Sequence, residues 1–348
     1  MSGSAAPHPD QARALRRWLV ACVVAVFLAV MVGGITRLTE SGLSITEWRP
    51  VSGVLPPMTE AGWQDAYQAF LRIPQAETTH KGITLGGFKL IFWWEWFHRI
   101  LARGVGLVFA IPYAWLLWRG AIPARYRWRL AALPLLTLAQ GALGWYMVTS
   151  GLSVRSSVSA YRLTAHLALA LAILVIALWT YADLRPRARD ATATNGWRWA
   201  TLALVIAIGT TILSGGFVAG LRAGTIFNTF PLMGGQVVPP GYGTLAGWWT
   251  NAFENPVAAQ FHHRVLALLT GAAAIFAAWR ARRGGLDAEA ANAVRLVGGV
   301  ALLQVLLGIA TLLLAVPLLL GVLHQFVGVV ALSAGVLALH TVRSGARG

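Results

Sequence analysis

The sequence predicts an all-α, polytopic membrane protein with eight transmembrane helices, arranged as two tandem, pseudo-symmetric four-helix bundles. Three observations support this prediction: eight long apolar segments, arginines gathered in alternate connections, and a set of residues that recurs in both halves. Of the 348 residues, 57% are hydrophobic and 11% are charged, and the mean hydropathy is +0.63. Soluble globular proteins carry about 25% charged residues, so this composition excludes that class.

The apolar segments are long enough to cross a bilayer, because a transmembrane helix needs about 20 residues. We expect them at residues 18–36, 92–118, 129–149, 160–182, 198–219, 260–280, 293–314 and 317–341. The polar residues before the first segment lead into it without a convincing cleavage site, so we interpret it as a retained helix. The single cysteine, Cys22, lies within this segment, which excludes an intramolecular disulfide and a cysteine-based metal cluster.

The arginines predict the orientation of the chain. The net charge is +16, and arginine-rich runs precede the first segment and follow the second, fourth, sixth and eighth. Because loops rich in Lys and Arg stay in the cytoplasm, we expect both termini there and the long connections at 37–91 and 220–259 outside. This placement between apolar segments argues against nucleic acid as the partner of the positive charge.

The two halves of the chain share four features in the same order. The matches are Gly33-Gly34 with Gly215-Gly216, His98-Arg99 with His263-Arg264, Gln140 with Gln304, and His166 with His324. The interval from histidine to glutamine is nearly equal, 42 residues (140 − 98) and 41 residues (304 − 263). Each half contains an even number of segments, so the repeat is parallel. We therefore expect a bundle at residues 1–184 and a second at 185–348.

Four histidines lie near the start of even-numbered segments, namely His98, His166, His263 and His324. At ~1.5 Å per residue, these positions lie roughly 5–12 Å below the outer surface. Two histidines from facing helices are what a six-coordinate haem iron requires. Histidines that only bond to their neighbours are the alternative, which the matched pairs disfavour. Zinc or copper is disfavoured because each bundle offers only two strong ligands.

The other histidines have no such role in this interpretation. His262 adjoins His263, and adjacent helical residues point about 100° apart, so only one of them faces the pocket. His8 and His80 lie outside the segments, and His340 lies near the cytoplasmic end, all without counterparts.

Arg99 and Arg264 each follow a proposed ligand near the membrane interface. A guanidinium matches a carboxylate in shape and charge, so both are candidates to bind haem propionates. Snorkelling to the interface or a structural ion pair is the alternative.

Glu95 distinguishes the two halves. It lies three residues before His98, on the same helical face, whereas Gln260 occupies that place before His263. Charges within a membrane are costly and indicate function, so the first bundle is expected to perform chemistry with Glu95 as its catalytic residue. The alternative is a structural ion pair between Glu95 and Arg99, Arg103 or Lys89.

The first long connection contains a possible surface helix. Thr59 is a helix cap, and Trp63, Tyr67, Phe70 and Leu71 follow at helical spacing. This pattern predicts an amphipathic helix on the membrane or over a site beneath it, or else ordinary loop packing.

The chain resembles the haem A synthase family, specifically its proteobacterial and mitochondrial branch. The resembling stretches are GGITRLTESGLSITEWRPVSGVLPP (33–57), FKLIFWWEWFHRILAR (88–103), Ala165-His166, FNTFPLMGG (227–235), QFHHR (260–264) and LHQ (323–325). They cover both halves. The resemblance implies an inner-membrane enzyme that oxidises a ring methyl of haem O to a formyl group, giving haem A for terminal oxidases.

The resemblance also assigns roles. His98 and His166 would ligate the substrate or product haem, His263 and His324 a haem b, and Glu95 would match the acidic residue thought to be catalytic. Implied partners are haem O, membrane lipid, a haem O synthase, oxidase assembly factors and an unidentified electron acceptor. Some members carry a cysteine pair in the first outer loop, which this sequence lacks.

Two other functions are considered. A di-haem b electron carrier of the quinol-oxidising type would hold two equivalent haems. Both haems would lie in the outer leaflet, which gives no path across the bilayer, and Gln260 makes the halves unequal. A transporter would carry paired charges near the midplane, which the sequence does not show.

Overall fold

The computed structural model describes residues 9–49, 52–152, 157–185 and 193–344. Within these ranges the regular structure is helical, apart from one isolated bridge between Met233 and Gln236. The α-helices are α1 (Pro9–Leu38), α2 (Glu60–Leu71), α3 (Pro74–Thr78), α4 (Leu85–Trp118), α5 (Arg127–Leu152), α6 (Ala160–Asp183), α7 (Asn195–Gly220), α8 (Trp248–Glu254), α9 (Pro256–Ala281), α10 (Ala288–Leu313) and α11 (Leu318–Ser344). Short 3-10 turns lie at Ser52–Val54, Ala124–Tyr126 and Ala223–Thr225.

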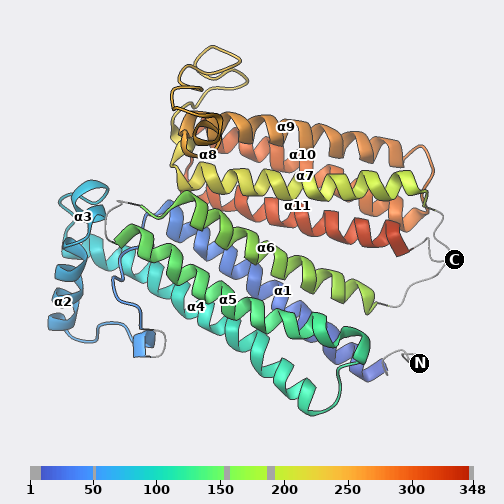
Figure 1. Ribbon diagram of the computed structural model, residues 1–348, viewed down its shortest axis with the longest axis horizontal. Helices are drawn as coiled ribbons and strands as arrows, with labels where there is room; N and C mark the ends of the chain where they lie inside the picture. Colours follow the sequence, from blue (N-terminus) through green and yellow to red (C-terminus); the bar gives the residue numbers. More distant parts are fainter. Residues whose placement is uncertain (1–8, 50–51, 153–156, 186–192, 345–348) are drawn as a thin grey trace.

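Eight of these helices are long and apolar enough to cross a membrane, with 24 to 34 residues each. The predicted all-α fold with eight spans is therefore confirmed. Six helices begin earlier than predicted, namely α1, α4, α5, α7, α9 and α10. In α4 and α9 the capping residue lies before the apolar run. Thr84 accepts a hydrogen bond from the backbone N–H of Gly87, and Asn255 caps Val257 and Ala258. The helix α4 consequently projects beyond its neighbours toward α2 and α3 (Figure 1).

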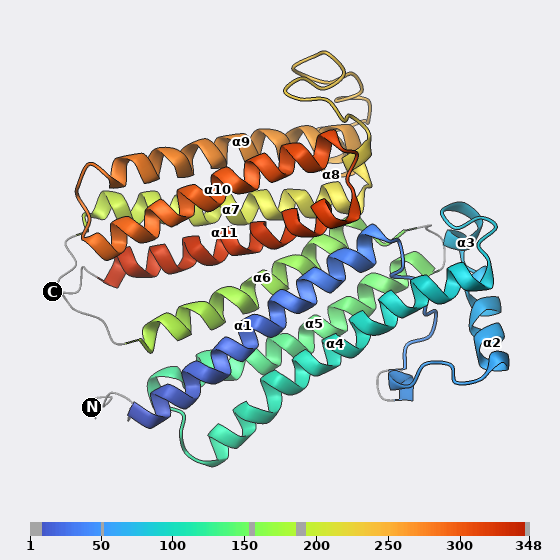
Figure 2. The same cartoon turned by 180° about the vertical axis from the view of Figure 1, so that it is seen from behind.

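The contacts divide the long helices into two groups of four, seen from both sides in Figures 1 and 2. In the first group α4 and α6 each contact both α1 and α5, and in the second α9 and α11 each contact both α7 and α10. The groups meet where α6 packs on α7 and α11, and where α1 packs on α11. The helices α1, α6 and α11 are accordingly the most buried of the spans, so the apolar core follows this seam.

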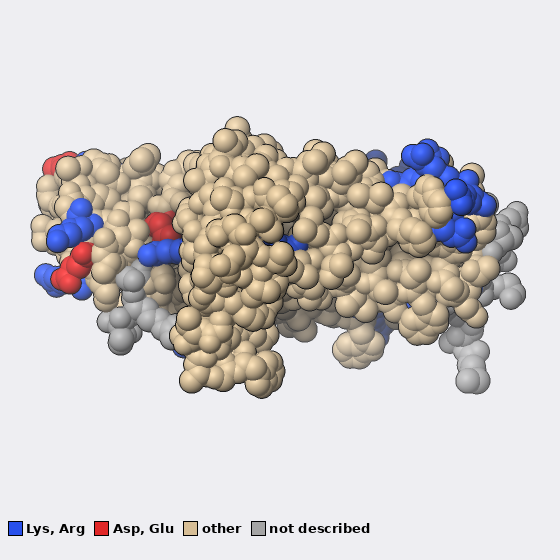
Figure 3. All heavy atoms as spheres, turned by 90° about the horizontal axis from the view of Figure 1, so that it is seen from above, with Lys and Arg blue, Asp and Glu red and all other residues tan. Residues whose placement is uncertain are grey.

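Both termini lie at one end of the molecule, and α2, α3 and α8 lie at the other, here called the loop end (Figure 1). Figure 3 shows a band with few charged side chains across the middle of one face. Basic side chains gather beyond it at the terminal end, where Arg280, Arg282 and Arg283 close α9. Both signs of charge occur at the loop end. The excess of basic side chains at the terminal end is the feature on which the predicted orientation rests.

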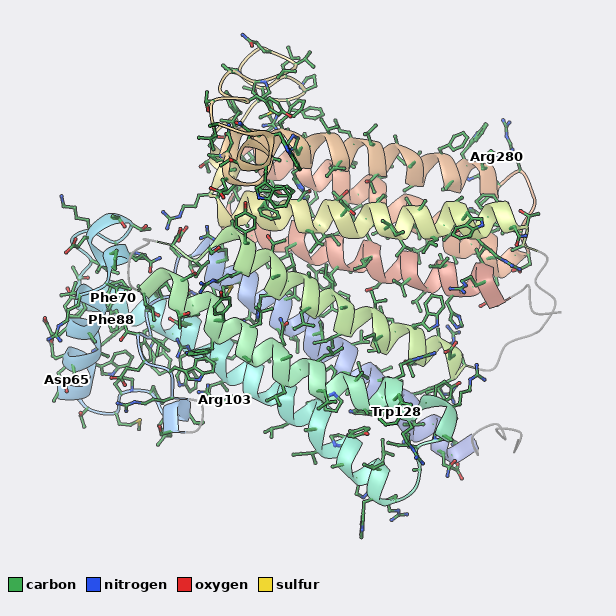
Figure 4. All side chains as sticks on the ribbon, viewed as in Figure 1. Asp65, Phe70, Phe88, Arg103, Trp128 and Arg280 are labelled. Carbon is green, nitrogen blue, oxygen red and sulfur yellow. The ribbon has the colours of Figure 1, made fainter. Side chains whose placement is uncertain are left out.

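The predicted helix after Thr59 is α2, and the Thr59 side chain accepts from the backbone N–H of Gly62 at 3.1 Å. Its apolar face packs on the first turns of α4. The ring of Trp63 lies 4.9 Å from that of Phe92, and the rings of Phe70 and Phe88, both fully buried, lie 5.3 Å apart (Figure 4). The helix therefore supports the projecting end of α4.

The two groups of helices are also tied together at the loop end. Arg37 donates to the backbone carbonyl of Ala219 at 2.5 Å, and Arg222 pairs with Glu40 at 2.8 Å. Each contact joins residues 182 positions apart, which is also the offset between Gly33 and Gly215. Glu40 and Arg222 share a left-handed backbone, with φ of 54° and 55°. Equivalent residues therefore meet here, as residues beside a common axis do.

Candidate functional site

The four histidines of the predicted sites lie on four helices that all start at the loop end: His98 on α4, His166 on α6, His263 on α9 and His324 on α11. The rings of His263 and His324 face each other with centres 6.3 Å apart and planes at 89°. Two imidazoles on opposite sides of one metal ion have centres about 6 Å apart, given metal–nitrogen bonds of about 2 Å. His98 and His166 are close enough to interact electrostatically. The structure thus brings the histidines together in the predicted pairs.

Each of the four imidazoles packs against a glycine of a neighbouring helix. A Cβ atom built on the glycine would come within 3.3 Å of His98 (from Gly33), 3.0 Å of His166 (Gly144), 3.1 Å of His263 (Gly215) and 2.8 Å of His324 (Gly308). A larger residue would push the ring away, so each glycine determines how closely the imidazole approaches the neighbouring helix. The arrangement fits two bis-histidine haem sites. The sequence pattern identified Gly33 and Gly215 but missed Gly144 and Gly308, although each lies four residues after a repeated glutamine.

The repeated glutamines hold the histidine helices in place. The side-chain amide of Gln140 donates to the backbone carbonyl of His166 at 2.9 Å, and Gln304 donates to that of His324 at 3.0 Å. A polar side chain in a membrane needs such a partner. The side-chain amides of the glutamines therefore hold the backbone of a histidine in each half.

Glu95 is 2% exposed and accepts four hydrogen bonds. One carboxylate oxygen accepts from the Ser44 hydroxyl at 2.8 Å and from the Ile45 backbone N–H at 2.7 Å. The other accepts from two nitrogens of Arg99 at 2.9 and 2.6 Å. The structure therefore contains the ion pair with Arg99 that the sequence offered as an alternative. Removing one partner of a buried pair costs about 3–5 kcal/mol.

Gln260, at the equivalent place in the second half, is also 2% exposed. Its amide donates to the backbone carbonyls of Gly224 and Phe227 at 3.4 and 3.2 Å. The first half thus presents a carboxylate to a loop N–H and hydroxyl, whereas the second presents an amide to loop carbonyls. The polarity of the contact is reversed between the halves.

Both candidate propionate-binding arginines contact the loop that follows the first helix of their half. Arg99 donates to the carbonyls of Ile45 and Glu47 at 2.7 and 2.9 Å. Arg264 donates to those of Phe227 and Thr229 at 2.5 and 2.7 Å. The accepting residues differ by the same 182 positions as the ion pair at the loop end. The Nε of Arg264 is buried without a hydrogen-bond partner, so this arginine retains a donor for a further carboxylate.

The other ionisable residues near the sites have partners elsewhere. Arg103 donates to the carbonyl of Arg49, and Lys89 pairs with Glu60. The rings of His262, His80 and His340 bond to Tyr242, the Glu40 carbonyl and Asp183. These three histidines have hydrogen-bond partners outside the two pairs; His8 lies outside the described residues. No group of three or more His, Cys, Asp or Glu placed to hold a metal ion occurs in the described part of the chain.

A profile of the family described as "Cytochrome oxidase assembly protein" matches residues 16–336. The chain is 44% identical to the heme A synthase of Sphingopyxis alaskensis over 340 residues, which cover 97% of this chain and 94% of the relative. It is 46% identical to the heme A synthase of Rhizorhabdus wittichii, with 97% and 96% covered, and 43% identical to that of Rhodopseudomonas palustris strain BisB5, with 97% and 93% covered. These matches include both histidine pairs and span almost the whole sequence. The chain therefore belongs to the cytochrome oxidase assembly protein family, together with the haem A synthases that it resembles.

Proposed function

We propose that this chain is a haem A synthase, an oxidoreductase that converts a ring methyl of haem O into the formyl group of haem A. The observation that carries the proposal is the pair of bis-histidine sites, each ring set by a glycine, in a chain similar to haem A synthases over 97% of its length. With water as the oxygen source, oxidation of a methyl to a formyl group releases four electrons and four protons. The site must therefore place the methyl, admit water and accept protons.

The two halves are assigned different haems. Residues 1–184 hold the substrate haem O and the product haem A between His98 and His166. Residues 185–348 hold a haem b between His263 and His324. The support for this division is that only the first half has a carboxylate, Glu95, one turn from a ligand. Haem supplies the redox chemistry when bound, and the protein supplies placement and proton handling.

Glu95 is the proposed catalytic residue. Its carboxylate oxygens accept hydrogen bonds from Arg99 and from the Ile45 backbone N–H, and its proposed role is that of a proton acceptor. All four of its hydrogen bonds come from protein, so it accepts a proton from substrate or water only by releasing one of them. The Ser44 hydroxyl is the partner that is released most easily, because its single proton has a second acceptor, the Ile91 carbonyl at 3.3 Å. Ser44, in the loop after α1, is therefore the proposed partner that gives way when Glu95 accepts a proton.

Arg264 and Arg99 are the proposed propionate partners. The unpartnered buried Nε of Arg264 supports this role in the second half. Arg99 already donates to Glu95 and to two loop carbonyls, so it has less capacity left. We also propose that both termini face the cytoplasm of a bacterial inner membrane, which places both haems toward the outer face. Haem O synthase and oxidase assembly factors are the proposed partners in haem transfer.

The function is tested by co-expressing the full chain with a source of haem O, extracting the haems and separating them by chromatography. Haem A or hydroxylated haem O in the extract is the expected result. Haem b together with unchanged haem O, and neither haem A nor hydroxylated haem O, would overturn the proposal and favour an electron carrier. A cell that expresses the haem O source alone provides the baseline.

A further inference from the structure

Ser214 on α7 contacts one of the four histidines, and we infer that it is a positioning residue that selects the ligating nitrogen of His263. This inference rests on the proposed function, because it explains how the second half retains a resident haem while the first exchanges one. Among the described residues, His263 is the only histidine of the two pairs whose ring bonds to a side chain. The contact joins the Ser214 Oγ and the His263 Nδ1 at 2.9 Å.

The direction of this hydrogen bond follows from the other contact of the serine. The Ser214 Oγ lies 2.7 Å from the backbone carbonyl of Thr211. A carbonyl oxygen only accepts, so the single hydroxyl proton points toward Thr211. The lone pairs of the same oxygen are left for His263, whose Nδ1 must then carry the proton. A neutral imidazole protonated at Nδ1 has its free lone pair on Nε2, which is the nitrogen left to bind a metal.

The equivalent position in the first half is occupied by Val32. It lies next to Gly33 as Ser214 lies next to Gly215, and it is buried. A valine offers no polar atom, and no hydrogen bond to the His98 ring is present within the described residues. Because Val32 stands where the second half has Ser214, the hydrogen bond to a ring nitrogen is present at His263 and, among the described residues, absent at His98.

The ring of His98 is also oriented differently. In His166, His263 and His324 the atom nearest to the packing glycine is Cε1, followed by Nδ1. In His98 the nearest atom is Nε2, at 3.3 Å from the position of a Cβ on Gly33. The usual ligating nitrogen of His98 therefore points toward the backbone of α1. The first site is therefore less preorganised for iron than the second.

The chemical consequence is a difference in ligand strength. A hydrogen bond from the second ring nitrogen fixes the tautomer and makes the ligating nitrogen more basic, and such partners typically change metal affinity by about 10- to 100-fold. A more basic ligand favours ferric over ferrous iron, which lowers the reduction potential. Ser214 thus suits a haem that stays bound, and Val32 suits a haem that must leave as product.

The test uses the full chain in detergent with variants Ser214→Ala, Ser214→Thr and Val32→Ser. Bound haem b is followed by its absorption during incubation with excess apomyoglobin, and its midpoint potential is measured by spectroscopic redox titration. For Ser214→Ala we expect haem b to be lost at least about 10-fold faster and the potential to rise. Ser214→Thr, which restores the hydroxyl, should return both values toward wild type.

The first half provides an independent arm that does not require Ser214→Ala to fold. Val32→Ser supplies a hydroxyl beside His98, and we expect slower loss of the haem held by the first pair. Unchanged haem retention and potential in Ser214→Ala, in protein of wild-type helicity, would overturn the inference. So would unchanged exchange in Val32→Ser. Both measurements are independent of haem A formation, so an inactive wild-type chain would count against the proposed function and not against this role of Ser214.

Discussion

The two groups of helices hold their histidines in nearly the same way but surround them with different polar groups. Glycines set the four rings, glutamines fix two of the ligand backbones, and arginines bind the following loops in both groups. Two of the differences lie beside the histidines: Glu95 against Gln260, and Val32 against Ser214. The packing around the histidines therefore recurs in both groups, whereas these polar contacts do not. We expect these two positions to separate the proposed roles of the halves.

The largest expected effect comes from removing a ligand. His263→Ala leaves His324 without its partner, so we expect loss of the b-type absorption of the second site. His262→Ala is the matched control, because His262 is adjacent but bonds to Tyr242. Reduced-minus-oxidised spectra of purified protein provide the measurement. Equal loss in both variants would show that the pairing is wrong.

Exchange of the polar groups between the halves should have the next largest effect. Glu95→Gln keeps the shape of the side chain but removes the base, so haem A formation should fall by about 10²- to 10⁴-fold while haem stays bound. Chromatography of extracted haems measures this change. Gln260→Glu is the reciprocal variant and should not create a second site of haem A formation.

Glu95 also bonds to the loop at Ser44 and Ile45. A loss of activity in Glu95→Gln therefore has two explanations, loss of the base and a change in this loop. Ser44→Ala removes one donor and leaves the carboxylate with Arg99, so it should retain more activity than Glu95→Gln. Hydrogen exchange of residues 40–48 separates the two roles. Faster hydrogen exchange of residues 40–48 in Glu95→Gln, with haem A formation restored once this loop is stabilised, would exclude the catalytic role.

A smaller effect is expected at the glycines. Gly144→Ala and Gly308→Ala place a Cβ within 3.0 and 2.8 Å of a histidine ring, and such overpacking costs about 1–3 kcal/mol. Thermal denaturation followed by haem absorption measures the loss. Gly141→Ala and Gly299→Ala lie on the same two helices with nothing within 4 Å, so they should be neutral or slightly stabilising. Similar destabilisation in all four variants would contradict the packing role.

The smallest effect is expected at the contact between the two groups. Glu40→Gln weakens its ion pairs with Arg37 and Arg222, and because the side chain of Glu40 is partly exposed we expect a loss of about 1 kcal/mol or less. The melting temperature at low and high salt measures it, since salt screens such pairs. Glu60→Gln, in the more exposed pair with Lys89, is the control and should change less.

The sequence predicted the eight spans and the two histidine pairs, because apolar length and residue identity are local properties. It placed the start of α4 at residue 92 instead of Leu85, since hydropathy does not register the Thr84 cap. It could not predict that Ser44 and Ile45 bind Glu95, because those contacts join residues about fifty positions apart through a folded loop. Ser214 and Gly308 were missed for a related reason: a serine or glycine within an apolar helix has no distinctive pattern until its neighbour is known.

The ion pair between Glu40 and Arg222 has a consequence for electron transfer. It lies at the loop end, the same end at which the four histidine-bearing helices begin, and it joins equivalent points of the two halves. Together with the contact between Arg37 and Ala219 it joins the two halves at this level. These contacts help to set the distance between the two proposed haems. Because electron tunnelling falls steeply with distance, they would also bear on the rate at which electrons taken from the substrate methyl cross to the second haem.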